Sequence, residues 1–229
     1  NIFIFFRYEN FIIKFKGIKL ETNIRDPHDR EVFFTQKYEE KQFQKIEDII
    51  KQNKIDIFID VGANSGIYSL ILSKKFNDLK IYALEPIKET YQKFLRNIIL
   101  NKLEKKIFHY NLGLSNKEEV LKMKTKVKFG YSQSAGYHVS KDGIEEAKFK
   151  IGDNLLDHNN MRICIKIDTE GHEQFVLEGL TKLIDNNNIF LQIEIWDKNL
   201  NNVKILLKKL NFTFIEKVNN DYYFKKTNR

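Results

Sequence analysis

The chain has 229 residues, a length that fits one α/β domain better than two small ones. Hydrophobic residues make up 42% of it, enough for one sizeable core, and no apolar run reaches the length of a transmembrane helix. The single cysteine, Cys164, excludes an internal disulfide and indicates a reducing, cytoplasmic setting. The chain does not begin with Met, which indicates a trimmed chain or a piece of a longer one.

The net charge is +8 at pH 7. Such a charge is typical of proteins that bind polyanions, and also of an ordinary lysine-rich surface. The basic residues are spread along the chain, and we find no motif of interleaved basic and aromatic residues for stacking bases. We therefore expect no specific nucleic-acid partner.

Residues 1–50 are predicted to hold short strands, turns and one helix. Asp26-Pro27-His28-Asp29 is typical of a turn. Apolar residues at helical spacing between Glu39 and Lys51 predict the helix. Residues 51–229 are predicted to form an open α/β core, and the two parts together make one domain over residues 1–229.

Strand and helix patterns alternate along this core, which predicts a mostly parallel sheet. Strands are predicted near residues 55–60, 79–84, 106–111, 162–167 and 189–195. Helices are predicted near residues 66–76, 88–101 and 200–210, and after residue 171 with Phe175, Val176, Leu180, Leu183 and Ile184 inward. The last two strands, 212–218 and 222–225, are predicted to form an antiparallel hairpin.

Residues 118–151 interrupt the alternation. Two strand-like stretches there enclose a polar segment from Gly130 to Gly136. We interpret this as an insertion over the edge or mouth of the sheet, where loops commonly carry specificity. Gln133, Ser134 and His138 are its candidate substrate-binding residues.

A glycine turn follows the first core strand. Its sequence, from Asp60 to Gly66, is Asp-Val-Gly-Ala-Asn-Ser-Gly, and a helical pattern follows. The next strand ends at Glu85, whose carboxylate could accept hydrogen bonds from two ribose hydroxyls. Strand, glycine turn, helix, strand and acid is the layout of a nucleoside site on an open α/β sheet.

The turn departs from a dinucleotide fingerprint. Asn64 stands at the middle glycine position, and Tyr68 and Ser69 stand where the third glycine would fall. This argues against a pyrophosphate pressed onto the helix and fits a ligand without phosphates, such as S-adenosylmethionine. An NAD-dependent oxidoreductase is the less favoured alternative.

Two acids follow the fourth core strand. Asp168 and Glu170 would face the same way if extended geometry continues to residue 170. One could act as a general base, or the pair could hold Mg²⁺ with Glu194 or water. The alternative is helix capping, with Asp168 or Thr169 as the N-cap. His172 is a further candidate base.

These motifs together resemble the FkbM family of S-adenosylmethionine-dependent methyltransferases. The resemblance rests on Ile59–Gly66, Glu85-Pro86, Gly113-Leu114-Ser115, and the Lys166–Glu173 element. It implies a Rossmann-like class I methyltransferase fold with a seven-stranded, mostly parallel sheet. It also implies methyl transfer, mostly to hydroxyl oxygens of sugars, polyketides and similar compounds.

The resemblance also implies the site residues. The cofactor-binding candidates are Asp60, Gly62, Asn64, Gly66, Tyr68, Ser69, Glu85, Pro86, Asn111, Gly113 and Leu114. The catalytic candidates are Asp168, Glu170 and His172, and Glu194 joins the substrate-binding candidates. We expect an O-methyltransferase acting on a sugar or glycan precursor, for example in bacterial capsule or lipooligosaccharide biosynthesis. The net charge hints at a phosphate-bearing acceptor, and an RNA or other small-molecule methyltransferase is the alternative. Neither the oligomeric state nor the acceptor itself follows from these residues.

Overall fold

The computed structural model describes residues 9–125, 127–128 and 131–226. Within them, a seven-stranded sheet has the order β14-β15-β13-β12-β3-β4-β5. Its strands are β3 (Ile57–Val61), β4 (Lys80–Leu84), β5 (Ile107–Tyr110), β12 (Arg162–Ile167), β13 (Asn188–Glu194), β14 (Phe212–Val218) and β15 (Asp221–Lys226). Adjacent strands pair in parallel except at β15, which runs antiparallel to both β13 and β14. The predicted mostly parallel sheet with a terminal antiparallel hairpin is confirmed.

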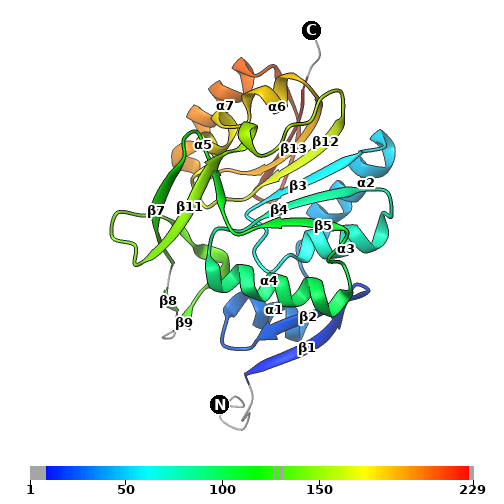
Figure 1. Ribbon diagram of the computed structural model, residues 1–229, viewed down its shortest axis with the longest axis vertical. Helices are drawn as coiled ribbons and strands as arrows, with labels where there is room; N and C mark the ends of the chain where they lie inside the picture. Colours follow the sequence, from blue (N-terminus) through cyan, green and yellow to red (C-terminus); the bar gives the residue numbers. More distant parts are fainter. Residues whose placement is uncertain (1–8, 126, 129–130, 227–229) are drawn as a thin grey trace.

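Helices cover both faces of this sheet (Figure 1). One face packs against α2 (Glu40–Asn53), α3 (Ile67–Lys75) and α4 (Lys88–Asn101), with Phe58, Ile81 and Cys164 from the strands. The other face packs against α5 (Glu173–Glu178), α6 (Thr181–Asp185) and α7 (Leu200–Lys209). Successive strand residues alternate between the two cores, as the two-residue period of a strand requires. In the described part of the chain, no helix is both long and apolar enough to span a membrane.

An N-terminal unit lies beyond α4. The hairpin β1 (Asn10–Phe15) and β2 (Ile18–Asn23) is followed by α1 (Pro27–Thr35). Asn97 and Asn101 of α4 accept hydrogen bonds from the backbone of β2, each at 2.8 Å. These bonds fix the hairpin, and through it α1, against the core.

The segment around Pro27 is a helix, so the predicted turn is wrong. The Asp26 carboxylate accepts from the amides of His28 and Asp29 at 2.8 and 3.3 Å, which makes Asp26 the N-cap of α1. Pro27 occupies the first helical position, where its missing N–H costs nothing. The Asp-Pro pair serves turns and helix starts alike.

Residues 113–151 build a second, smaller sheet. It has the order β10-β7-β11-β6, from β6 (Gly113–Ser115), β7 (Glu119–Lys124), β10 (His138–Val139) and β11 (Glu145–Ile151). The short pair β8 (Val127–Lys128) and β9 (Tyr131–Ser132) and the 3-10 turn η2 (Ser134–Gly136) lie within it. Figure 1 shows β7 and β11 standing beside the carboxyl ends of the main strands.

Two further details differ from the predictions. Where one helix is predicted, α5 and α6 are separate and meet at Gly179 and Leu180. Gly179 packs so closely on the carbonyl oxygen of Ser115 that a side chain there would overlap it. Phe175 is 41% exposed rather than inward. The described residues also form the 3-10 turns η3 (Gly152–Asn154) and η4 (Asp197–Asn199).

Candidate active site

A pocket opens at the carboxyl ends of β3, β4, β12 and β13. Ligands of open α/β sheets bind at this edge, because the loops that leave the strands converge there. The wall opposite the glycine turn comes from the smaller sheet and from α1, through residues such as Met123, Phe149 and His28. Of the cofactor-binding candidates, Asp60, Gly62, Asn64, Tyr68, Glu85, Pro86, Gly113 and Leu114 line the pocket.

The glycine turn packs too tightly for side chains at its two glycines. Gly62 has φ +83°, and a Cβ there would overlap the carbonyl oxygen of Asp168. Gly66 has φ +85°, and a Cβ there would overlap the ring of Phe94. Gly66 therefore serves packing against α4 and does not line the pocket. Both positions need the left-handed backbone that glycine adopts without strain.

Glu85 holds the turn in shape. Its carboxylate accepts from the amides of Asn64 and Ile87, both at 2.9 Å. Burial raises the pKa of Glu85 to about 7, and these two amide bonds only partly offset the burial. Asn111 lies outside the pocket lining and donates to the carbonyl oxygens of Glu85 and Pro86 at 2.9 and 3.2 Å. Asn111 thus positions the Glu85 segment.

Asp60 is buried at the end of β3. Its Oδ2 accepts from the Ser69 hydroxyl at 2.6 Å. Burial raises the pKa of Asp60, and the nearby Lys166 ammonium acts against this shift. Ser69 is itself fully buried and lies outside the lining, so it orients Asp60.

Lys166 is a buried cation in the pocket lining. It pairs across the sheet with Asp60, and its Nζ lies 2.9 Å from Oδ2 of Asp168 and 5.1 Å from the Tyr68 ring centroid. Burial disfavours its charged form, but the surrounding carboxylates of Asp168, Asp60 and Glu39 outweigh burial and raise its pKa. The Tyr68 hydroxyl donates to Glu39 at 2.8 Å.

Asp168 and Glu170 both line the pocket, although the predicted extended geometry ends before residue 170. Glu170 has φ +52°, in the left-handed region. The predicted cap at Asp168 or Thr169 is wrong: the N-cap of α5 is His172, which makes no side-chain capping bond. Glu173 instead folds back and accepts from the amide of Gly171 at 2.8 Å.

Glu194 lies at the end of β13 and lines the same pocket. Burial, then the negative charges of Asp168, Asp221 and Glu170, raise its pKa to about 8. Asp168, Glu170 and Glu194 do not form a metal-type cluster. Among the described residues, three ligand atoms within 4.8 Å of one another occur at Asp26, His28 and Asp29 alone. The carboxylates of that group already cap α1 and pair with Lys93.

His172 is buried between the rings of Phe149 and Phe175 and lines the pocket. Its Nε2 lies 3.1 Å from the Ser115 hydroxyl. Burial lowers its pKa to about 4, so the ring is neutral at physiological pH. This environment suits a packing role better than proton abstraction near neutral pH.

Two of the four substrate-binding candidates lie in the pocket and two lie outside it. Ser134 and Glu194 line the pocket, whereas Gln133 and His138 do not. The carbonyl oxygen of Gln133 accepts from Thr125 at 2.6 Å, and the His138 ring lies 6.0 Å from the Trp196 ring.

Several pocket residues have no role in the sequence-based assignment. The main ones are His28, Tyr38, Glu39, Tyr137 and Lys166. Lys166 belongs to a motif that carries the family resemblance, but the spacing of that motif gives no role to it. The pocket lining is strongly acidic, with Glu39, Asp60, Glu85, Asp168, Glu170 and Glu194 against the one ammonium of Lys166 among its described residues.

The strand order, the reversed β15 and the pocket beside the glycine turn define a Rossmann-like class I methyltransferase fold. A family model described as the methyltransferase FkbM domain matches residues 60–217. The chain therefore belongs to the FkbM methyltransferase family.

Individual relatives agree with this assignment. The hexuronic acid methyltransferase AglP of Haloferax volcanii is 28% identical over 142 residues, which cover 61% of this chain and 56% of that protein. The chain thus matches little more than half of this relative's length. The FkbM methyltransferase structure from Methylobacillus flagellatus has a TM-score of 0.53 at 16% identity, over 75% of this chain and 43% of that one. A putative O-methyltransferase from Klebsiella pneumoniae has a TM-score of 0.52 at 9% identity, over 82% and 80%. At these identities the two structures show the fold alone.

Proposed function

We propose that the chain is a cytoplasmic, S-adenosylmethionine-dependent O-methyltransferase that acts on a hydroxyl of a sugar or glycan precursor. Its pathway, on this proposal, is the biosynthesis of a bacterial surface polysaccharide. The sugar class draws support from the printed activity of the relative AglP, and the hydroxyl acceptor from the FkbM family membership.

The acidic lining beside the glycine turn carries the cofactor proposal. Asp60, Glu85 and Asp168 line the pocket beside the turn: Glu85 accepts from the Asn64 amide, and the Asp168 carbonyl oxygen packs against Gly62. A pyrophosphate would place further negative charge beside these groups, whereas a sulfonium cation would be attracted. The polar atom Asn64 Oδ1 is enclosed and lacks a hydrogen-bond partner in the structure, which fits a site that a ligand completes. The lining therefore favours S-adenosylmethionine over NAD.

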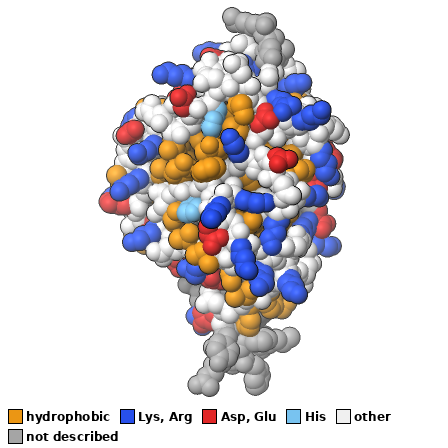
Figure 2. Space-filling view, turned by 45° about the vertical axis from the view of Figure 1, so that its right-hand side comes forward, with side chains coloured by type: hydrophobic (Ala, Val, Ile, Leu, Met, Phe, Trp, Pro, Cys, Tyr) orange, Lys and Arg blue, Asp and Glu red, His pale blue; other side chains and the backbone are white. Residues whose placement is uncertain are grey.

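The same lining does not favour RNA. Figure 2 shows lysine and arginine side chains on the face in view with acidic ones among them, whereas the described lining of the pocket contributes one ammonium, that of Lys166. Nucleic-acid sites concentrate such cations along the path of the phosphates.

For the chemistry, S-adenosylmethionine would supply the methyl group. We assign cofactor binding to Asp60, Gly62, Asn64, Tyr68, Glu85, Pro86, Gly113 and Leu114, with Gly66, Ser69 and Asn111 shaping the site around it. Asp168 or Glu170 would accept the proton of the attacking hydroxyl, with His172 as the weakest candidate. Fixing the acceptor in line with the methyl group would contribute much of the rate. Ser134 and Glu194 would contact the acceptor, and Gln133 and His138 would support the loop that carries Ser134.

A divalent cation fits the residues present poorly. The Asp168 Oδ2 already accepts from the Lys166 ammonium at 2.9 Å, and a metal ion there would be repelled by that charge. The proposed mechanism therefore uses no metal ion.

Ligand binding tests the proposal. Titration calorimetry should detect S-adenosylhomocysteine binding with a micromolar or tighter Kd, and no binding of NAD. Glu85→Ala should weaken that binding at least ~10-fold, while Glu145→Ala, on the exposed part of β11, should leave it unchanged. Binding of NAD alone would contradict the methyltransferase assignment of this pocket.

A further inference from the structure

Glu39 is a pocket residue with an unusual backbone and an unusual side-chain position. It stands directly before α2, at the N-cap, and its φ of +37° and ψ of 45° lie in the left-handed region, which glutamate rarely adopts. Side chains at this position commonly cap the helix, but Glu39 makes no capping bond and lines the pocket instead. Such strained residues persist where the surrounding structure imposes them, and they cluster at ligand sites.

One carboxylate oxygen of Glu39 is fixed and the other is open. Oε2 accepts from the Tyr68 hydroxyl at 2.8 Å. The Tyr68 ring packs in turn against the rings of Tyr38 and Phe43, with centroids 6.0 and 4.9 Å away. Oε1 accepts no hydrogen bond from a described residue, and unlike the amide oxygen of Asn64 it is open to solvent. The carboxylate is therefore held in place with one oxygen left for a ligand.

The Glu39 carboxylate also has no ion-pair partner among the described residues. Lys166, the ammonium of the pocket lining, pairs at 2.9 Å with Oδ2 of Asp168 instead. Burial raises the pKa of Glu39, and the nearby charge of Lys166 acts against this shift. A cationic ligand would act in the same direction as Lys166, because an adjacent positive charge favours the ionised carboxylate. Glu39 is thus suited to a ligand that brings its own positive charge.

The place of Glu39 in the fold indicates which end of the cofactor it meets. The glycine turn follows β3, which lies between β4 and β12 in the sheet. Glu85, the ribose candidate, follows β4, whereas Glu39 bonds to Tyr68, whose ring lies 5.1 Å from the Lys166 ammonium of β12. Strands β4 and β12 are two strand spacings apart, about 10 Å. A nucleoside with its ribose at Glu85 can therefore extend its amino-acid end across the turn to Glu39.

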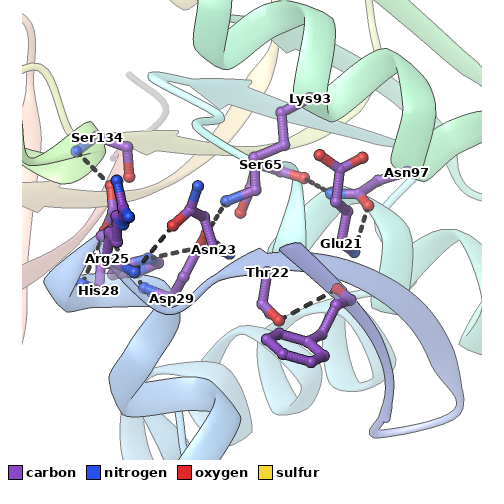
Figure 3. A network of polar contacts seen from close by, with 12 residues as sticks. Glu21, Thr22, Asn23, Arg25, His28, Asp29, Ser65, Lys93, Asn97 and Ser134 are labelled. Atoms are coloured by element: carbon purple, nitrogen blue, oxygen red, sulfur yellow. Dashed lines mark hydrogen bonds and ion pairs between the residues drawn. The ribbon is translucent and has the colours of Figure 1, made fainter. Parts of the chain in front are cut away.

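The chain reaches Glu39 from the N-terminal unit, and this unit is fixed to the glycine turn. Asn97 of α4 accepts from the backbone of β2 at 2.8 Å and donates to the carbonyl oxygen of Ser65, in the turn, at 3.0 Å (Figure 3). Asp29 of α1 forms an ion pair with Lys93, also of α4. Helix α4 thus holds the turn and the segment that presents Glu39 in one arrangement.

We propose that the Glu39 carboxylate binds the ammonium group at the amino-acid end of S-adenosylmethionine. This inference rests on the proposed function, because it assigns a partner to one end of the proposed cofactor. NAD has no ammonium group, so the same contact favours S-adenosylmethionine over NAD. Glu39 acts here in binding, at the end of the cofactor that methyl transfer leaves unchanged.

Calorimetry with two ligands tests this contact. S-adenosylhomocysteine carries the ammonium group, and its deaminated analogue, in which a hydrogen atom replaces that group, keeps the carboxylate. The unmodified protein should bind S-adenosylhomocysteine at least ~10-fold more tightly than the analogue, as expected for one hydrogen bond between charged groups. Glu39→Gln should weaken binding of S-adenosylhomocysteine by a similar factor. The affinity of this variant for the analogue should stay within about twofold of the unmodified protein, so the two ligands should then bind almost equally.

Glu40→Gln is the matched control. Glu40 is the next residue along the chain, its side chain is 58% exposed, and it lies outside the lining of this pocket. The change should leave both affinities and their ratio as they are in the unmodified protein. Binding of the analogue by Glu39→Gln shows in the same experiment that the pocket of that variant is folded.

Three results would overturn the contact. Equal binding of the two ligands by the unmodified protein would show that the ammonium group is not recognised. An unchanged affinity ratio in Glu39→Gln would assign recognition to another group. An equal loss of both ligands in that variant would show that Glu39 only shapes the pocket. If the unmodified protein bound neither ligand, the proposed function itself would fail.

Discussion

Glu85 both holds the glycine turn in shape and sets the charge beside it. The carboxylate that fixes Asn64 and Ile87 through their amides is buried and has a pKa near 7. It therefore gains a proton within the physiological range, whereas an exposed glutamate would remain ionised down to pH ~4.3. A protonated carboxyl group is a weaker acceptor for ribose hydroxyls.

Binding of S-adenosylhomocysteine should consequently weaken as pH falls. Below pH 7 the affinity should drop by up to ~10-fold per pH unit, because the ionised form of Glu85 becomes the minority. Calorimetry at pH 6 and pH 8 measures this. Glu85→Gln cannot titrate and should bind weakly with a flatter pH profile; the same slope in that variant would assign the effect to another group.

Asp168 and Glu170 are the residues to change for catalysis. Asp168→Asn and Glu170→Gln keep the size of each side chain but remove its basicity. If either carboxylate is the general base, its variant should lose roughly 10²–10⁴-fold in the turnover of an accepted sugar substrate. The Kd for S-adenosylhomocysteine should change little. Full turnover in both variants would exclude these carboxylates from proton transfer.

The ion pair between Lys166 and Asp168 makes a prediction about metals. Because the ammonium already compensates this carboxylate, prolonged dialysis against EDTA should leave turnover within about twofold. Added Mg²⁺ should not raise it. Activity that disappears with EDTA and returns with Mg²⁺ would show that Asp168 exchanges its partner for a metal ion.

At the scale of elements, the turn after β3 depends on a backbone that only glycine adopts freely. Gly62 and Gly17 have nearly equal φ values, +83° and +85°, but only Gly62 would overlap a neighbour, the Asp168 carbonyl oxygen. Gly17→Ala should cost about 1 kcal/mol in stability through the left-handed backbone alone. Gly62→Ala should cost about 3 kcal/mol and abolish cofactor binding, since overlap adds to the same strain. Urea denaturation compares the two, and equal losses would rule out the close contact as the cause.

Most elements of the core follow from local patterns, because periodicity and turn residues are local properties. The helix over 88–101 and the strand over 162–167 have the predicted bounds. The errors occur where distant residues meet or where one local pattern fits two structures. The break between α5 and α6 falls at Gly179, which packs against Ser115, 64 positions earlier in the sequence. The α1 segment resembles a turn because Asp-Pro begins both.

The predictions of site residues also succeed where the signal is local and fail where the position of a residue depends on distant parts of the chain. The glycine turn, Glu85, Asp168 and Glu170 lie at strand ends, and strand ends converge at one edge of a parallel sheet. Lys166, Glu39 and His28 reach the pocket through strand register and through the packing of the N-terminal unit. No spacing rule in the sequence encodes those placements, so motif reasoning identifies the cofactor side of the pocket and misses these three residues.

On the scale of the whole molecule, the net charge and the charge of the pocket have opposite signs. The chain carries +8, whereas the pocket lining holds mainly carboxylates. The excess lysines lie outside the lining and so do not identify what enters it. The net charge of a protein bears on its solubility and on its rate of association with charged partners. The nature of the acceptor must instead be inferred from the side chains that line the pocket.

The crowded carboxylates of the pocket have a calorimetric consequence. With pKa values near 7 and 8, Glu85 is partly protonated and Glu194 mostly protonated in the empty pocket at neutral pH. Their protons reduce the negative charge of the pocket. An incoming sulfonium cation takes their place, so binding of S-adenosylmethionine at pH 7 should release protons to the solvent. The measured binding enthalpy should therefore differ between phosphate and Tris buffers, whose ionisation enthalpies differ. The neutral thioether of S-adenosylhomocysteine should release fewer protons, and methyl transfer would thereby return protons to the pocket as the product forms.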